Sequence, residues 1–176
     1  MITLYGPGPG RSMVSEPDTE DAKDLVRQAA THAARGEYPQ ALRCYELALL
    51  LDETQASNWF HYGNLQQRMG LAEDAADSYE FALRQDPRLY AARFCLAQLM
   101  VELGRPLIAL SHFALVTVDK PGHLPAWRNL IELQRRMGEL DAAAESARRA
   151  LRHLPGEGEL AALLDGIERE QAHPAS

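Results

Sequence analysis

Residues 56–89 carry the pattern on which the fold depends, and they read ASNWFHYGNLQQRMGLAEDAADSYEFALRQDPRL. Near their start, Trp59, Tyr62 and Gly63 follow the three- and four-residue spacing that places side chains on one face of a helix. Gly70 comes where that helix would end. A second apolar stripe of helical spacing follows, and the Asp-Pro pair near the end of the stretch disfavours a further helical turn. We therefore predict two helices joined by a tight turn.

The residue types of this stretch recur along the chain every 34 residues. The repeated places hold a glycine (Gly36, Gly70, Gly104, Gly138), an alanine (Ala41, Ala75, Ala109, Ala143), an aromatic residue (Tyr45, Tyr79, Phe113) and a closing proline (Pro87, Pro121, Pro155). The first unit has Glu53 in place of the proline, and the fourth has Ala147 in place of the aromatic residue. Since chance does not supply four such registers together, we predict four tandem units, which span 22–55, 56–89, 90–123 and 124–157.

The repeated pattern, W-x2-L-G-x2-Y followed by A-x3-F and a proline, resembles the tetratricopeptide repeat family. Residues 56–89 fit it best, whereas 90–123 have Arg93 in the tryptophan place and 124–157 have Ile131 in the small-residue place. The resemblance covers roughly three quarters of the chain. It implies an all-α fold, a right-handed superhelical α-solenoid of helix-turn-helix repeats, and it says almost nothing about the partner.

The two ends of the chain differ from the repeats. Residues 1–21 contain the run Gly6-Pro7-Gly8-Pro9-Gly10, which continues neither a helix nor a strand, so we expect a flexible leader. Residues 158–171 carry an apolar stripe among charged residues, and we expect them to form a ninth helix that closes the last repeat. We expect residues 172–176 to be a frayed tail.

Function in this family resides in the concave groove that the first helices of successive repeats line. The resemblance places these predicted partner-binding residues in the groove: Phe60, His61, Asn64, Arg68, Phe94, Gln98, Glu102, Arg128, Asn129, Glu132 and Arg135. Phe60 and Phe94 are 34 residues apart and hence stacked in adjacent repeats. Two interpretations stay open for them, which are contact with a bound peptide and cover by neighbouring parts of the chain.

Charge and composition exclude several classes of partner. The chain has 176 residues and a net charge of -7, so general binding to nucleic acid is disfavoured. No apolar run approaches the ~18 residues that span a bilayer. Residues 120–155 hold seven basic and four acidic groups, which would favour an acidic partner segment unless they are ordinary solvated helix faces. The two cysteines, Cys44 and Cys95, show no metal spacing and indicate a reducing, cytoplasmic compartment.

No catalytic pattern is present in the sequence. The six histidines include no i, i+4 pair, and phosphate-binding and nucleophile-elbow motifs are absent. His61 and Cys95 fall on one groove place in adjacent repeats, but no orienting third group accompanies them. We therefore expect a protein that is not an enzyme and that uses no cofactor or metal.

The resulting hypothesis is a protein–protein interaction scaffold or adaptor that holds a peptide or helix of a partner in its groove. A first alternative is a chaperone similar to the type III secretion class, with a hydrophobic client. A second is a self-assembling scaffold, a homo-oligomer built through exposed ends. In relatives that clamp the carboxylate end of heat-shock chaperones, the clamp uses fixed groove places, and of these only Asn64 matches here.

Overall fold

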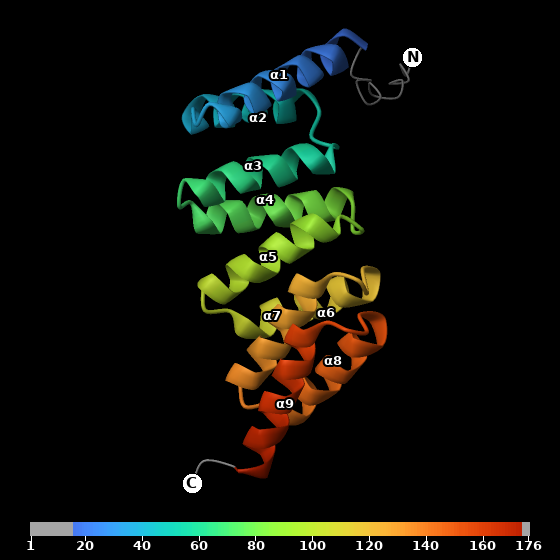
Figure 1. The fold of residues 1–176 in the computed structure, drawn as a ribbon. Helices are drawn as coiled ribbons and strands as arrows, with labels where there is room; N and C mark the ends of the chain where they lie inside the picture. Colours follow the sequence, from blue (N-terminus) through green and yellow to red (C-terminus); the bar gives the residue numbers. More distant parts are fainter. Residues whose placement is uncertain (1–15, 174–176) are drawn as a thin grey trace, which may run out of the picture.

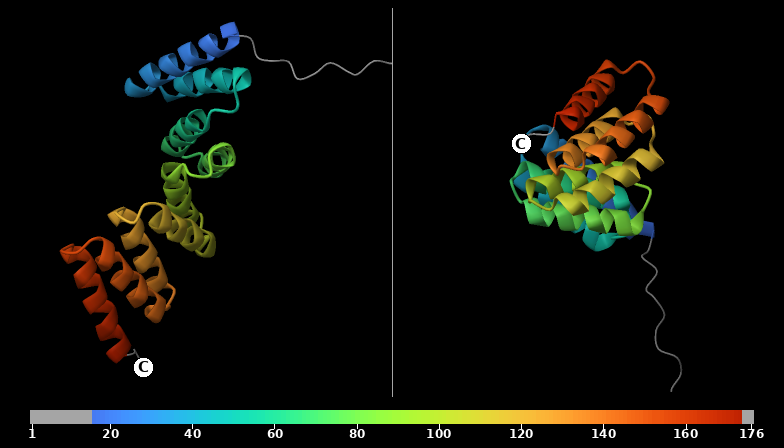
Figure 2. Two further views of the ribbon diagram at one scale, coloured as in Figure 1. Left: turned by 90° about the vertical axis from the view of Figure 1, so that its right-hand side faces the viewer. Right: turned by 90° about the horizontal axis from the view of Figure 1, so that it is seen from below.

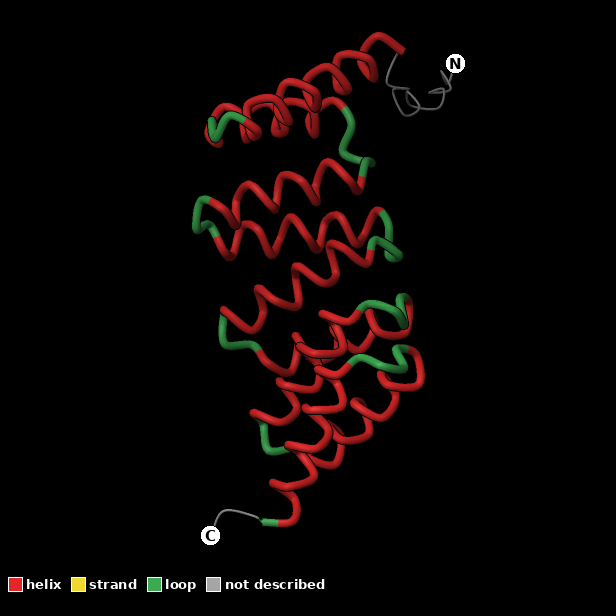
Figure 3. Tube along the Cα trace, viewed as in Figure 1, coloured by secondary structure: helices red, strands yellow, loops and turns green. Residues whose placement is uncertain are grey.

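The computed structural model describes residues 16–173, and this part of the chain forms nine α-helices that stack in chain order (Figure 1). The helices are α1 (Glu16–Ala34), α2 (Tyr38–Leu51), α3 (Ala56–Arg68), α4 (Ala72–Gln85), α5 (Tyr90–Glu102), α6 (Pro106–Asp119), α7 (Leu124–Arg136), α8 (Leu140–His153) and α9 (Gly158–Ala172). Within the described range the helices alternate with short loops and no strand occurs (Figure 3). The all-α solenoid expected from the repeat pattern is confirmed.

The helices pair into four antiparallel hairpins, α1–α2, α3–α4, α5–α6 and α7–α8. Each hairpin packs on the next, and α9 packs on α8. The two views of Figure 2 show that successive hairpins turn relative to one another, so that the stack curves as a superhelix. The first helices of the hairpins and α9 thereby form one wall of the curve, and the second helices form the other.

The first helix differs from the expectation for the leader. Helix α1 begins at Glu16, so residues 16–21 belong to it and not to a leader that runs to residue 21. Pro17 is the second residue of this helix, where proline costs no hydrogen bond because the first amides have no intrahelical partner. The rest of the expected leader, residues 1–15, and residues 174–176 of the expected tail lie outside the described residues.

Each hairpin turn is closed by the repeated glycine. Gly36, Gly70, Gly104 and Gly138 all have positive φ, between 69° and 79°, which a side chain would strain. The residue after each glycine donates a backbone hydrogen bond to a carbonyl five residues earlier, for example Leu71 to Gln66 at 2.9 Å. This is the Schellman arrangement that satisfies carbonyls at a helix end.

In the second, third and fourth repeats, a side chain of the first helix donates a hydrogen bond to a carbonyl of the loop that precedes the repeat. Trp59 Nε1 donates to the carbonyl of Glu53 at 2.8 Å, and Trp127 Nε1 donates to that of Pro121 at 2.8 Å. In the repeat between them, Arg93 donates through Nη2 to the carbonyl of Pro87. The guanidinium thus replaces the indole as hydrogen-bond donor, although it does not fill the same space.

The core of the described residues divides into two clusters. The larger one runs from Ala75 to Ile167 and includes Trp127, Phe113 and Tyr79, all at most 1% exposed. The smaller one lies in the first hairpin and the adjoining face of α3. Helix α9 contributes Leu160 and Ile167, both fully buried, and so covers the apolar face of α8. In the described part of the chain, no helix combines the length and apolar character that crossing a membrane requires.

Candidate functional site in the concave groove

A pocket of about 230 Å³ opens on the concave wall between α5 and α7. The residues that line it are Gln98, Val101 and Glu102 of α5, Phe113 of α6, and Asn129, Glu132, Leu133 and Arg136 of α7. Four of these, Gln98, Glu102, Asn129 and Glu132, belong to the set predicted from the sequence. The repeat register brings them together because equivalent places on successive first helices are neighbours on one wall.

The pocket has an apolar floor and a polar rim. Phe113 and Leu133 are 1% and 6% exposed and close its base, while Val101 is half-buried on one side. Amide groups, two carboxylates and the exposed guanidinium of Arg136 surround the opening. Such an arrangement accommodates one aliphatic side chain of a ligand and offers hydrogen bonds to the main chain that carries it.

A second pocket, of about 410 Å³, continues the groove between α7 and α9. Its lining residues are Arg128, Asn129, Glu132, Glu159, Ala162 and Leu163. Asn129 and Glu132 line both pockets, so the two depressions lie on either side of these α7 side chains. Helix α9 thus extends the concave wall as well as closing the core.

The two arginines of α7 that were predicted to bind a partner form ion pairs with carboxylates of the chain itself. Arg135 lies 3.0 Å from Glu132 and 2.8 Å from Glu170 of α9, and Arg128 lies 3.4 Å from Glu159. The hydrogen bond that Arg135 donates to the Glu170 carboxylate is the main cause of the raised pKa of Arg135. These ion pairs neutralise Arg128 and Arg135, so among the described α7 arginines only Arg136, which is exposed at the pocket rim, has no ion pair and could meet an acidic partner segment.

The two groove phenylalanines pack against their own repeats. The ring of Phe60 lies 6.0 Å from that of Tyr79 and 5.3 Å from that of His61. Phe94 lies 5.8 Å from Phe113, edge to face. Both phenylalanines are half-buried against the larger core cluster, which gives them a packing role whether or not a ligand reaches them.

The other predicted residues on α3 also have partners within the chain. The Tyr79 hydroxyl lies 2.8 Å from Asn64 Oδ1, and the guanidinium of Arg68 lies 4.9 Å from the centre of the Tyr38 ring. His61 stacks on Tyr45, and partial burial lowers its pKa. No described pocket unites these residues with the α5–α7 pocket, so they stay predicted contacts.

Four lining residues of the pocket lie outside the predicted partner-binding set: Val101 and Arg136, which face the groove in the repeat register, and the core residues Phe113 and Leu133. The repeat pattern identifies Phe113 only as the repeated aromatic residue, and it does not single out Leu133. The sequence could have identified Leu133, because it directly follows the groove residue Glu132 on the same helix. Its side chain therefore points from the edge of the groove toward the core. A pocket floor is made by core residues, and a search for exposed positions alone does not find them.

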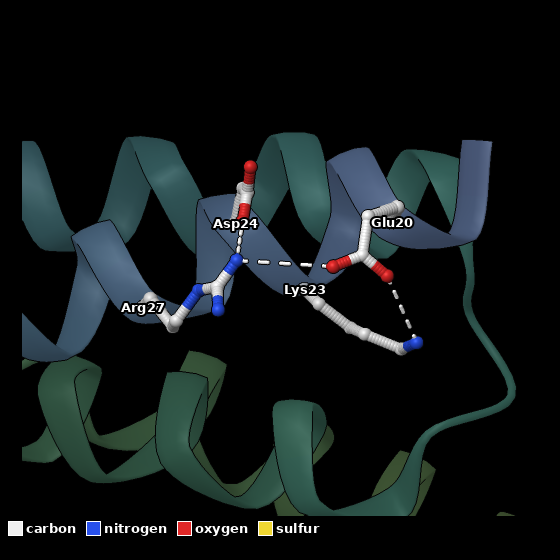
Figure 4. Close-up of polar contacts among 4 residues, drawn as sticks. All are labelled: Glu20, Lys23, Asp24 and Arg27. Atoms are coloured by element: carbon white, nitrogen blue, oxygen red, sulfur yellow. Dashed lines mark hydrogen bonds and ion pairs between the residues drawn. The ribbon is translucent and has the colours of Figure 1, made fainter. Parts of the chain in front are cut away.

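The groove at α1 is charged and is ordered by local ion pairs. Lys23 lies 3.2 Å from Glu20, and Arg27 pairs with Glu20 and with Asp24, as Figure 4 shows. All four side chains are more than half exposed, so these pairs contribute little to stability. A wide depression of about 650 Å³ separates this face of α1 from the start of α3.

The cysteines and histidines do not form a reactive or metal-binding cluster within residues 16–173. Cys44 and Cys95 are free thiols, and burial raises the pKa of Cys95, which opposes formation of a thiolate. Among the described residues, no three or more His, Cys, Asp or Glu side chains are grouped so as to hold a metal ion.

Comparison with known proteins supports the fold. No protein-family model matches the chain. A curated relative, the tetratricopeptide repeat and J domain-containing co-chaperone DNJ1 of Cryptococcus neoformans var. grubii serotype A, is 30% identical over 89 residues, which are 51% of this chain and 17% of the relative. The chain thus matches less than a fifth of that protein's length.

Solved structures of similar shape extend over most of the chain. YrrB, a TPR protein with an unusual peptide-binding site, has a TM-score of 0.75 at 22% identity and covers 90% of this chain and 82% of its own. MamA from Desulfovibrio magneticus RS-1 has a TM-score of 0.73 at 16% identity, with 87% and 86% covered. The first TPR of Spaghetti (RPAP3), bound to an HSP90 peptide, has a TM-score of 0.65 at 15% identity, with 68% and 95% covered.

The repeat period, the hairpin geometry and these relatives agree with one another. The described residues therefore have the fold of tetratricopeptide repeat proteins, with four tandem helical hairpins and a C-terminal helix that caps them.

Proposed function

We propose that the chain is a non-catalytic interaction scaffold that binds a segment of a partner protein along its concave wall, with the α5–α7 pocket as the main anchor point. The observation that carries this proposal is the apolar floor of Phe113 and Leu133 beneath the amides of Gln98 and Asn129. An apolar hollow with a few convergent polar groups is the usual form of a binding site.

The neighbours in shape support a peptide as the ligand class. One solved relative is described as having a peptide-binding site, and another was solved with an HSP90 peptide bound. The pocket itself favours an extended or helical segment that inserts one aliphatic side chain while the α7–α9 depression receives the adjoining residues. A single contact segment of this size has an affinity on the order of micromolar.

A peptide selected against the whole chain from a random display library provides the test. Val101→Lys fills the pocket from α5 and should weaken the selected peptide at least tenfold by calorimetry. Asn129→Ala, on the half-buried polar rim, should weaken it several-fold without a packing defect. Val118→Lys is the matched control, because it places the same change on the convex side of α6, where the side chain is 62% exposed.

The proposal fails if Val101→Lys and Asn129→Ala bind the selected peptide as tightly as the wild type does. It also fails if Val118→Lys abolishes binding while the two groove variants retain it, because the selected ligand would then occupy the convex side. Thermal denaturation of each variant separates loss of binding from loss of folding.

A further inference from the structure

Helix α6 presents an apolar face to solvent on the convex side of the solenoid. Leu107 and Val118 are 70% and 62% exposed, and Ile108 and Leu115 are each 46% exposed. Together with Ser111 and Ala114 they form a stripe along the helix at helical spacing, which we call the α6 face (Leu107, Ile108, Ser111, Ala114, Leu115, Val118). The stripe contains no charged residue.

The two neighbouring repeats show that these six places can hold charged residues, although α2 of the first repeat has only Arg43 and Glu46 charged among them. On α4 they are Glu73, Asp74, Asp77, Glu80, Phe81 and Arg84, and on α8 they are Asp141, Ala142, Glu145, Arg148, Arg149 and Arg152. Five of six are charged in each neighbour, whereas none is charged on α6. Since the same fold tolerates charge at every one of these places, the apolar character of α6 is not a requirement of the repeat.

The one hydroxyl on the α6 face does not change its character. Ser111 Oγ donates to the carbonyl of Ile108 at 2.7 Å, one turn back on the same helix. The Ser111 hydroxyl therefore has a hydrogen-bond acceptor within the helix, and it needs none from water or from a ligand. The face runs from Leu107 to Val118, most of the length of α6, and so offers apolar contact over roughly 18 Å at the helical rise.

The charges that border the face are acidic on one side. On α4, Asp77 and Glu80 are exposed and have no ion-pair partner among the described residues, while Glu73 is held by Arg105 at 2.9 Å. On α8, Arg148 lies 2.7 Å from Glu168 and Arg152 lies 3.6 Å from Glu145, so two of its arginines are already paired. The surroundings therefore favour a ligand with positive charge toward α4.

The size of the face favours a single helix over a second copy of this chain. A standard interface buries about 800 Å² on each partner, and one stripe on a convex surface offers less, because the neighbouring helices curve away from a flat partner. The α6 face of a second copy contains no charged residue, so it would bring no positive charge to Asp77 and Glu80. A single amphipathic helix matches both the length of the stripe and its acidic border.

We infer that the α6 face is a second docking surface, distinct from the groove, for an amphipathic helix of a partner protein with an aliphatic stripe and lysine or arginine on one flank. The chain then connects two protein segments, one on each side of the solenoid. This inference does not depend on the groove proposal, because the groove pocket uses the buried Phe113 of α6, whereas the α6 face consists of side chains on the exposed side of that helix.

A pair of synthetic helical peptides tests this inference with the full chain. Both carry leucine at positions i, i+4, i+7 and i+11, and the flanks are lysine in one and glutamate in the other. Calorimetry should find the lysine peptide bound at least tenfold more tightly. The lysine peptide should lose several-fold in affinity with Asp77→Asn/Glu80→Gln.

The decisive variant is Leu107→Glu/Val118→Arg, which installs the residues that α4 has at the same places and leaves the net charge unchanged. It should lose binding at least tenfold and melt as the wild type does. Leu50→Arg makes the equivalent change on α2, where the side chain is 81% exposed, and should bind normally. Val101→Lys, in the groove, should also bind normally.

Three results would overturn the inference. Equal binding of the two peptides would remove the charge argument, and loss of binding in Val101→Lys with retention in Leu107→Glu/Val118→Arg would place the peptide in the groove. A wild-type dimer in analytical ultracentrifugation that Leu107→Glu/Val118→Arg dissolves would assign the face to a second copy of the chain.

Discussion

Gly63 allows the two helices of the second hairpin to approach closely. A Cβ at this place would lie 2.9 Å from Cε1 of Tyr79 and 3.2 Å from Cβ of Ser78. The Tyr79 ring is fully buried and its hydroxyl is within hydrogen-bonding distance of Asn64 and Gln67, so it has little freedom to move away. We predict that Gly63→Ala lowers the free energy of unfolding by about 1–3 kcal/mol in urea denaturation.

Gly166 of α9 supplies the matched control for this substitution. A Cβ there meets no atom within 4 Å, and the residue lies inside a helix. Gly166→Ala should therefore stabilise the chain by about 0.5–1 kcal/mol through helix propensity. Equal effects of the two changes would show that close approach at Gly63 is not what the glycine provides.

Large and small residues exchange places between the hairpins. Gly63 and Ala97 stand opposite Tyr79 and Phe113 in the repeat pattern, whereas the fourth hairpin has Ile131 where a small residue is usual and Ala147 where an aromatic residue is usual. Both Ile131 and Ala147 are fully buried. The two departures from the family pattern therefore compensate each other in volume.

This compensation predicts coupling between the two sites. Ile131→Ala should cost about 2–5 kcal/mol by leaving a cavity, and Ala147→Phe about 1–3 kcal/mol by overpacking. The double variant reproduces the pair of the third repeat, Ala97 with Phe113, and should be more stable than the sum of the single losses by about 0.5–3 kcal/mol. If the losses of unfolding free energy in the two single variants simply add up in the double variant, Ile131 and Ala147 do not compensate each other in volume.

Arg93 and His112 link stability to pH in the third hairpin. Burial lowers the pKa of His112, and the positive charge of Arg93 lowers it further. Because the unfolded chain then binds the proton more readily than the folded one, this site costs no stability above about pH 6.5 and destabilises the fold increasingly as the pH falls below it. Arg93→Trp removes the charge and installs the residue of the neighbouring repeats.

Thermal denaturation between pH 5 and pH 7 tests this linkage. Arg93→Trp should reduce the loss of melting temperature toward low pH, and His112→Ser, which installs the residue found at this place in α4 and α8, should reduce it further. An unchanged slope in both variants would mean that other groups determine the acid sensitivity of the chain.

At the scale of helices, the sequence predicts well whatever repeats. The glycine turns indicated all four hairpins and the closing prolines the last three, because local backbone preference and the 34-residue register point to the same places. The predicted leader extended too far, to residue 21, because the run of glycine and proline suggested an irregular segment. Helix α1 in fact begins at Glu16, in a short acidic stretch that follows this run. The sequence at the start of α1 occurs only once, so no equivalent position in another repeat supports the prediction of its boundary.

In the groove, too, the features that repeat could be predicted from the sequence and the features that occur once could not. Its general position followed from the repeat, but the ion pairs of Arg128 and Arg135 with α9 did not, since α9 lies outside the repeated units. The apolar floor under Val101 also required knowledge of which core side chains reach the surface. Contacts between a repeat and a unique element depend on geometry that no internal comparison supplies.

At the scale of the whole molecule, the first hairpin is the part most weakly joined to the rest. Its core cluster is separate from the larger one, and the link to α3 includes the hydrogen bond from the Tyr62 hydroxyl to Glu46 at 2.9 Å. Burial, together with that carboxylate, raises the pKa of Tyr62 to about 12. In a solenoid each hairpin is stabilised only by its neighbours, so a terminal one opens first.

Amide hydrogen exchange should therefore be faster in α1 and α2 than in α5 to α8. Tyr62→Phe should lower the opening free energy of the first hairpin by about 0.5–1.5 kcal/mol and leave the exchange of α7 and α8 unchanged. Uniform protection across all the hairpins, or an equal loss everywhere in the variant, would show that the described helices unfold as one unit.

The central claim is that the concave wall between α5, α7 and α9 receives a partner segment. It is tested most directly by backbone amide chemical shifts of the chain during titration with the peptide selected against it. We predict that the shifted amides cluster around Gln98, Val101, Asn129 and Leu133 and continue to Leu163. Shifts confined to α2, α4, α6 and α8 on the opposite wall, with none on these residues, would contradict the account.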